Sequence, residues 1–251
     1  MTTEPITPCF LSQLDIAYGP RQSLGRFFLA ADNAAKVLGI QLSFGTFEEL
    51  VAVNEANRVS WLPLLSTYRP DCLPQKPGDF CLIGRDATGK VVATHATRVF
   101  GIPDSTFKDL AEGMDLFYSD PARMQLPSES CQITAPFAKQ ISGQVYFGGA
   151  AWYHPSFRGK GVGHIIPRIS RAVALAHSSI DWVAGIMSDG VIRGGLAQRS
   201  GYRNIERAVE FQNQYTGQLK GALTWMSRDE LIDDLIEATN ALRTQVDSRV
   251  A

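Results

Sequence analysis

The chain has 251 residues, 45% of them hydrophobic and 20% charged, which is enough to bury one large core or two small ones. Its formal net charge of −1 provides no strong basic field, so we expect it to bind neither nucleic acid nor anionic lipid. No apolar run is long enough to span a bilayer and the N-terminus lacks the pattern of a signal peptide, so we expect a cytoplasmic protein without a membrane partner.

The first hundred residues predict helices, a short strand and a hairpin. Residues 1–20 contain several proline and glycine breaks and are expected to be irregular. Apolar residues at helical spacing, followed by Gly39, predict a helix over residues 23–38. Thr46 and Glu49 form a capping box that opens a second helix. The other elements expected here are a strand at 40–44, a helix at 61–68, a loop at 69–79 and two hairpin strands at 80–85 and 90–100.

The second half predicts a strand, a glycine-rich turn and a helix in direct succession. The strand is expected at 144–153 and the amphipathic helix at 161–177, with Pro167 as an irregularity inside it. The remaining expected elements are a helix at 105–118 and a loop up to 143, then a buried strand at 181–187, a short helix at 191–200, strands at 206–212 and 219–226, and a final amphipathic helix opened by a capping box at 227–230.

The four cysteines are Cys9, Cys72, Cys81 and Cys131. None belongs to a C-x-x-C pair and none has a histidine at zinc-ligand spacing, so the sequence predicts no metal site. We expect buried thiols in a reducing cytoplasm.

The turn at residues 153–163 reads Tyr-His-Pro-Ser-Phe-Arg-Gly-Lys-Gly-Val-Gly. A helix N-terminus presents free backbone N–H groups and the positive end of the helix dipole, and glycines let the backbone approach an anion closely. Arg158 and Lys160 add positive charge, and His164 in the first helical turn can donate a hydrogen bond as well. The pattern therefore favours a phosphate or pyrophosphate site over a turn that only connects a strand to a helix.

Arg158, Gly161 and Gly163 match the R/Q-x-x-G-x-G/A signature, and the chain here resembles the GNAT acetyltransferase superfamily. The order of elements over residues 143–202 also resembles the core of that family. The resemblance implies an α/β fold with a central mixed β-sheet, splayed where acyl-CoA enters and flanked by helices. It implies a single domain over residues 1–251, made of an acceptor side with the hairpin (23–100), an insertion (101–143), an acyl-CoA-binding core (144–202) and late strands with a C-terminal helix (203–251).

The resemblance also implies an N-acyltransferase that uses acetyl-CoA as co-substrate and no metal. The acetyl group would pass directly to a primary amine of a small molecule or peptide, and the Ala151 amide would polarise the thioester carbonyl. A homodimer is compatible with this interpretation. The residues that the resemblance assigns to cofactor binding are Trp152, Tyr153, Arg158, Gly159, Lys160, Gly161, Val162, Gly163 and His164.

Two positions depart from the family pattern. Phe147 stands where many relatives have a carboxylate base, and Ala197 stands where many have a tyrosine acid. A catalytic base must then come from elsewhere, and the candidates are His95, whose imidazole would titrate near neutral pH, and Tyr146, whose orientation depends on a bulge at the glycine pair that follows it. Without such a base, the rate should rise from pH 7 to about pH 9 as the amine loses its proton.

Other interpretations remain open or are weaker. The alternative function is a non-catalytic acyl-CoA sensor or regulatory domain, because the proton-transfer groups do not carry over. Acidic residues scattered over 101–143 indicate a solvated face or an acidic lining that attracts an amine. Residues 84–90 fit most of a P-loop, but Val91 replaces the required Ser or Thr, and the glycine spacing at 159–163 is not that of a dinucleotide fold.

Overall fold

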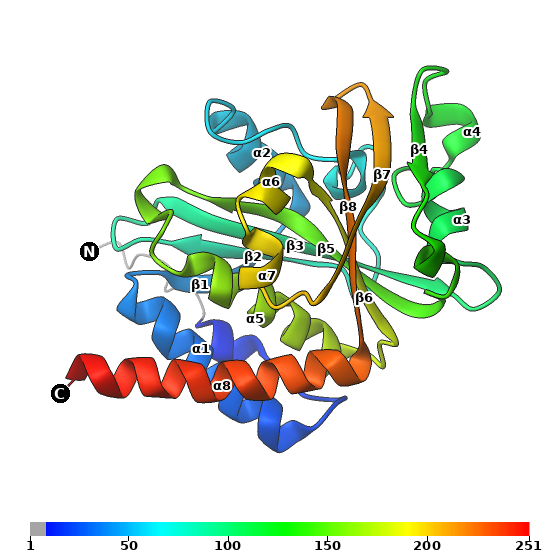
Figure 1. Cartoon of the computed structure of the whole chain (residues 1–251). Coiled ribbons are helices and arrows are strands. Elements are labelled where there is room, and N and C mark those ends of the chain that lie inside the picture. The colour runs from blue at the N-terminus through cyan, green and yellow to red at the C-terminus, as the bar shows by residue number, and fades with distance from the viewer. Residues whose placement is uncertain (1–8, 251) are drawn as a thin grey trace.

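The computed structural model describes residues 9–250, with side chains to residue 244 (Figure 1). Residues 1–8, which are part of the segment predicted to be irregular, and residue 251 lie outside the described range. The helices are α1 (Arg21–Val37), α2 (Phe47–Ala56), α3 (Phe107–Glu112), α4 (Pro121–Met124), α5 (Val162–His177), α6 (Asp189–Arg193), α7 (Leu196–Arg199) and α8 (Arg228–Val250). The strands are β1 (Gln41–Gly45), β2 (Phe80–Arg85), β3 (Val91–Ile102), β4 (Ser130–Ile133), β5 (Gly143–Tyr153), β6 (Trp182–Ser188), β7 (Asn204–Asn213) and β8 (Gly217–Ser227). Short 3₁₀ turns lie at Phe10–Gln13, Ser66–Tyr68, Pro136–Lys139 and Pro155–Phe157.

The strands of the described residues form one eight-stranded sheet in the order β1-β2-β3-β5-β6-β8-β7-β4. β5 and β6 pair in parallel, and the other neighbouring strands pair antiparallel. The helix α5 connects the two parallel strands, as a parallel crossover requires. The predicted fold class, a mixed sheet flanked by helices, is confirmed.

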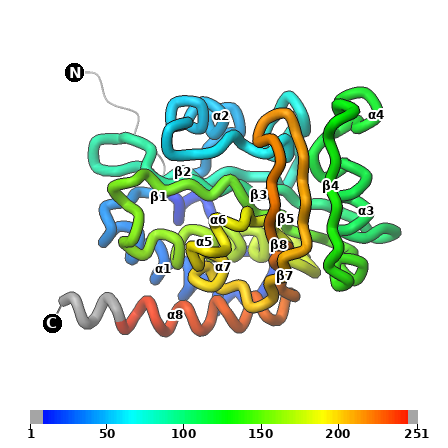
Figure 2. The backbone as a smooth tube through the Cα atoms, turned by 45° about the horizontal axis from the view of Figure 1, so that its top comes forward, coloured from blue at the N-terminus to red at the C-terminus, as the bar shows by residue number. Residues whose placement is uncertain are grey.

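Helices cover both faces of the sheet. α1, α5 and α8 lie together on one face in Figure 1, where Phe27, Ile169 and Leu235 belong to a common core. Figure 2 shows α8 along the lower edge of the molecule, and this helix packs against α1. On the other face, Phe47 of α2 and Phe107 of α3 belong to a second core. Both faces of the central strands are therefore buried.

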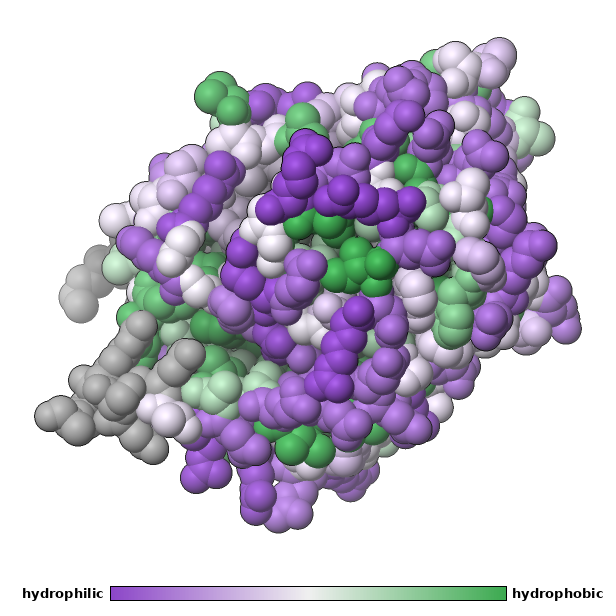
Figure 3. Space-filling model, viewed as in Figure 1, coloured by the Kyte–Doolittle hydropathy of each residue, from purple (hydrophilic) through white to green (hydrophobic). Residues whose placement is uncertain are grey.

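The outer surface is mainly polar. Figure 3 shows hydrophilic residues over most of one face, with hydrophobic residues in small groups between them. In the described part of the chain, no helix combines the length and the apolar composition needed to cross a membrane.

Three predicted helices differ from the structure. The helix predicted at 61–68 is wrong: only the 3₁₀ turn Ser66–Tyr68 forms there, because Pro63 lacks an amide hydrogen and disfavours helix in the residue before it. The helix predicted at 105–118 ends at Glu112, since Met114 takes the left-handed conformation at φ 68°. The helix predicted at 191–200 is divided into α6 and α7, with Gly195 between them at φ 71°.

The segment 113–143, predicted as loop from residue 119 onward, contains a strand. β4 pairs antiparallel with β7 at the sheet's edge, through residues from Ser130 to Ile133. A four-residue strand with two inward and two outward side chains has too little periodicity to be recognised without its partner.

Candidate active site

The sheet opens between its two parallel strands. β5 and β6 pair only as far as Phe147 and Ala184, although β5 continues to Tyr153 and β6 to Ser188. Beyond the opening, β5 stays paired with β3 and β6 stays paired with β8. A cleft separates the diverging ends, and the edge of β5 that faces it has no partner strand among the described residues.

A β-bulge accompanies this opening. The register between β3 and β5 shifts so that Ala150 and Ala151 both lie opposite His95. Ala150 has φ 50°, an uncommon conformation for a residue with a side chain, and its carbonyl accepts a hydrogen bond from Thr94 Oγ1 at 2.8 Å. A bulge bends the strand and increases its twist, which turns the end of β5 away from β6. The bulge predicted at the glycine pair 148–149 is found directly after it.

The two glycines before the bulge make room for two tyrosine hydroxyls. A side chain on Gly148 would clash with the Tyr146 hydroxyl, and one on Gly149 would clash with the Tyr68 hydroxyl. The Tyr146 hydroxyl donates to Ser170 of α5 at 3.1 Å, and Tyr146 is not among the described residues that line the cleft. Tyr68 does line it. The structure therefore brings Tyr68 to the cleft and does not bring the predicted Tyr146 there.

The cleft encloses about 370 Å³ and is mainly apolar. None of the described residues that line it is an aspartate or a glutamate. Its apolar walls include Trp61, Leu64, Leu65, Phe147, Ile186, Met187 and Leu219. Three buried side-chain atoms in this lining have no hydrogen-bond partner within residues 9–244: the Tyr68 hydroxyl, His95 Nδ1 and the Tyr153 hydroxyl. Because buried polar atoms are nearly always paired, these three indicate a place for a ligand with polar groups.

His95 is buried and uncharged. His95 lies on β3 opposite the bulge of β5, and it is 5% exposed. Burial, and then the nearby charge of Arg171, lower the pKa of His95 to about 3. The imidazole is therefore neutral at pH 7, contrary to the expectation that it titrates near that pH, and its unpartnered Nδ1 is available for a hydrogen bond.

The loop at residues 58–65 closes the cleft beside the end of β5. The rings of Trp61 and Trp152 stack, with centroids 5.3 Å apart, and Trp152 Nε1 donates to Ser60 Oγ at 3.2 Å. Arg158 donates from Nη2 to the Ser60 carbonyl at 2.7 Å and from Nε to the Tyr153 carbonyl at 3.0 Å. Arg158 therefore connects this loop to the end of β5 and holds the start of the glycine-rich turn in place.

The glycine-rich turn leads into α5. Gly159 and Gly161 have φ values of 75° and 90°, and the helix begins without a side-chain cap and without an acidic residue in its first turn. The amides of Gly159, Lys160 and Gly161 donate to no backbone carbonyl of the described residues. A Cβ on either glycine would meet no atom within 4 Å, so the space outside the turn is open. Unpaired amides at an open helix N-terminus are groups that can bind an anion.

The charged side chains of the turn are near the surface. Lys160 Nζ lies 5.1 Å from the centre of the Phe157 ring, and His164 is exposed. Partial burial, then the charges of Arg168 and Arg199, lower the pKa of His164. Val162 is buried in the core, so only its backbone can reach a ligand.

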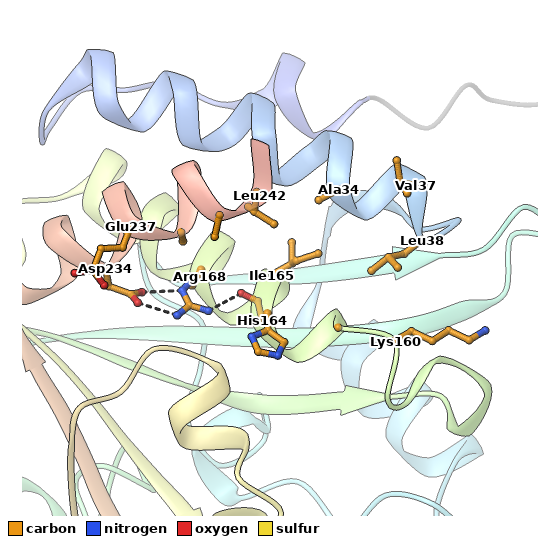
Figure 4. A pocket seen from close by; sticks show the side chains of 13 residues that line it. Ala34, Val37, Leu38, Lys160, His164, Ile165, Arg168, Asp234, Glu237 and Leu242 are labelled. Atoms are coloured by element: carbon orange, nitrogen blue, oxygen red, sulfur yellow. Dashed lines mark hydrogen bonds and ion pairs between the residues drawn. The ribbon is translucent and has the colours of Figure 1, made fainter. Parts of the chain in front are cut away.

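A second hollow, of about 610 Å³, lies between α1, α5 and α8 (Figure 4). Lys160, Gly161 and His164 reach one end of it. Arg168 donates to both carboxylate oxygens of Asp234, at 2.9 and 2.8 Å, as Figure 4 shows. None of the unpartnered buried side-chain atoms in residues 9–244 lines this hollow, so the cleft between β5 and β6 is the candidate active site.

Some of the predicted site residues lie together in one cleft. Ala151, Trp152, Tyr153, Arg158 and His95 line the cleft, and the predicted turn follows directly along the chain. Phe147 and Ala197 are buried and place no ionisable group there. The sequence pattern did not indicate Tyr68, Trp61 or Tyr202, which also line the cleft. No local signal distinguishes these aromatic residues from core residues.

No protein-family model matches the chain, and no curated protein sequence matches it either. Three of the solved structures that match the chain are acetyltransferases, each with a TM-score below 0.5. One is a spermidine N-acetyltransferase chimera from Vibrio cholerae and hSSAT, with 6% identity and a TM-score of 0.46, over 78% of this chain and 99% of that one. A ribosomal-protein-S5-alanine acetyltransferase from Vibrio fischeri has 11% identity and a TM-score of 0.42, over 76% of this chain and 94% of that one. An aminoglycoside acetyltransferase in complex with coenzyme A and kanamycin has 17% identity and a TM-score of 0.41, over 76% and 96%. A likeness at this level does not specify a reaction, which has to follow from the groups around the cleft.

Proposed function

We propose that this chain is a GNAT-type N-acyltransferase that transfers an acyl group, most simply acetyl, from its CoA thioester to an amine. The observation that supports it is the course of β5, which leaves β6 at Gly148 and runs with an open edge to the unpaired amides that begin α5. An extended pantetheine arm can pair with the open edge as an added strand, because its amides match the peptide groups of β5. Its pyrophosphate would then reach the amides of residues 159–163.

This placement puts the thioester at the bulge. The Ala151 amide lies on the open stretch of β5 and would polarise the thioester carbonyl. The amine nitrogen attacks the carbonyl carbon, the C–N bond forms, the C–S bond breaks and the thiolate leaves. His95 remains neutral and is too weak a base to take the amine proton, so we propose that the proton passes to solvent.

The lining favours an acceptor with an apolar body. Leu64 and Leu65 come from the loop side, Ile186 and Met187 come from β6, and no described carboxylate is present to pair with a polycation. An amine with one nucleophilic nitrogen on an aromatic or aliphatic body matches these walls, and so does an acyl group longer than acetyl. Buried thiols such as Cys81 and Cys131 stay reduced in the cytoplasm, which is the location we propose.

The proposal is tested by CoA binding and by thiol release. CoA at about a hundred times its dissociation constant should stabilise the fold by roughly 2.7 kcal/mol, which is a visible shift in melting temperature. Acetyl-CoA and longer acyl-CoAs should release free thiol with apolar amines faster than with polyamines. A flat thermal titration up to millimolar CoA would contradict the proposal.

A sensor that binds acyl-CoA without turnover is the second candidate. The observation that favours it is the absence, among the described cleft residues, of any carboxylate and of any histidine that titrates near neutrality. Binding of CoA without thiol release for any amine in the panel would support the sensor.

A further inference from the structure

The Tyr68 hydroxyl is a buried donor without an acceptor in the described part of the chain. Tyr68 is 1% exposed, its hydroxyl has no hydrogen-bond partner within residues 9–244, and it lines the cleft. It reaches the position that a side chain on Gly149 would occupy, directly before the bulge. A solitary buried hydroxyl costs free energy, and it lies where the proposed function places the reacting carbonyl.

The segment that carries Tyr68 is fixed at several points. Thr67 Oγ1 donates to the Leu116 carbonyl at 2.8 Å, and Arg98 Nε donates to the Thr67 carbonyl at 2.8 Å. The ring of Tyr68 stacks on Phe147, with centroids 6.0 Å apart and planes 8° apart. The hydroxyl is therefore held in one position before any ligand arrives, which is the property that electrostatic catalysis requires.

The acidity of the Tyr68 hydroxyl decides between two roles: giving a proton to the leaving thiolate, or donating a hydrogen bond while keeping the proton. Burial raises the pKa of Tyr68 well above its usual value of 10.0. A thiol has a pKa near 8.5, so a leaving thiolate is too weak a base to take the proton of such a phenol. Hydrogen-bond donation to an oxygen that gains negative charge needs no proton transfer, and a phenol that stays protonated is suited to it.

Resting on the proposed function, we propose that the Tyr68 hydroxyl donates a hydrogen bond to the thioester carbonyl oxygen as it becomes an oxyanion, alongside the Ala151 amide. Attack by the amine moves the carbonyl π electrons onto that oxygen. The same electron pair re-forms the C=O bond when the C–S bond breaks, and the thiolate then takes a proton from solvent. Tyr68 keeps its proton throughout and is a catalytic residue that touches the reacting atom.

The test is Tyr68→Phe, with Tyr118→Phe as the matched control. Tyr118 is also buried, but its hydroxyl donates to Glu129 at 2.8 Å and lies outside the cleft lining. We expect Tyr68→Phe to lower kcat by about 10²–10³-fold, with the KM for acyl-CoA and the amine within about twofold of wild type. Its melting temperature should not fall, because the lost hydroxyl has no partner. Tyr118→Phe should melt earlier and keep the wild-type kcat.

The outcomes separate this inference from the proposed function. A wild-type chain that binds no CoA, or releases no thiol with any amine, removes both. A wild-type chain that turns over while Tyr68→Phe retains its kcat overturns the role of Tyr68 alone. A raised KM for the amine at unchanged kcat would also overturn it, because the hydroxyl would then bind the acceptor and not the oxyanion.

Discussion

At the scale of single residues, the histidine in the cleft changes how the protein responds to acid. In the unfolded chain a histidine binds a proton below about pH 6.5, whereas His95 in the folded chain stays neutral until about pH 3. Unfolding therefore takes up one extra proton between these values. The stability that His95 contributes is complete above pH 6.5 and is lost as the pH falls toward 3.

His95→Gln should remove this dependence. Between pH 6 and pH 4, we expect the unfolding free energy of the wild type to fall by about 1.4 kcal/mol per pH unit more steeply than that of the variant. Urea unfolding of both proteins at several pH values measures the difference. If the unfolding free energies of the two proteins change equally with pH, the imidazole of the folded protein has an ordinary histidine pKa.

At the scale of elements, the proposed function assigns the CoA pyrophosphate to the turn between β5 and α5. Gly161→Glu should abolish CoA binding, because a carboxylate would stand at the unpaired amides where the pyrophosphate is placed. The fold should survive, since a Cβ at Gly161 meets no atom within 4 Å and the left-handed backbone at φ 90° adds only about 1–2 kcal/mol of strain.

Gly89→Glu is the control for that strain. Gly89 also has a left-handed φ, of 81°, and open space around its Cβ position, but it lies in the β2–β3 hairpin turn. Titration calorimetry with CoA should show binding to Gly89→Glu at wild-type affinity and none to Gly161→Glu. Normal binding to folded Gly161→Glu would mean that the anion site lies elsewhere.

At the scale of the whole molecule, the C-terminal helix is joined to the central crossover helix by one buried carboxylate. Asp234 of α8 is 4% exposed and accepts hydrogen bonds from Arg168 at 2.8 Å and from Arg171 at 3.4 Å, both on α5. Asp234→Ala leaves the buried Arg171 guanidinium without its carboxylate and should cost about 3–5 kcal/mol of stability.

Glu237→Ala, one turn further along α8, provides the comparison. Its ion pair with Arg203 is largely exposed, with 67% of the glutamate side chain and 56% of the arginine side chain accessible, so its loss should cost under about 1 kcal/mol. Urea unfolding of the two variants should show a large loss for Asp234→Ala only. Equal losses of stability in the two variants would mean that the contacts of Asp234 with Arg168 and Arg171 do not join α8 to the core.

The sequence by itself determined the elements whose signals are local. Gly161 and the amphipathic run after it predict an open helix N-terminus, and the structure has α5 beginning there with unpaired amides. The strand before it, the hairpin and the mixed α/β class are also confirmed. Backbone dihedral preferences, hydrophobic periodicity and capping act over a few neighbouring residues, so a single sequence carries them in full.

Only the tertiary structure decided which side chains meet in the cleft. Tyr68 reaches the bulge from a segment that sequence periodicity assigned to a helix, and His95 is neutral because it is buried and lies near the charge of Arg171. The short strand β4 exists through its pairing with β7. These features depend on contacts between residues far apart in the chain, and burial then sets their pKa values and leaves their polar atoms without partners. Neither distant contacts nor burial is encoded in a local pattern, which is why the turn could be predicted and the tyrosine at the bulge could not.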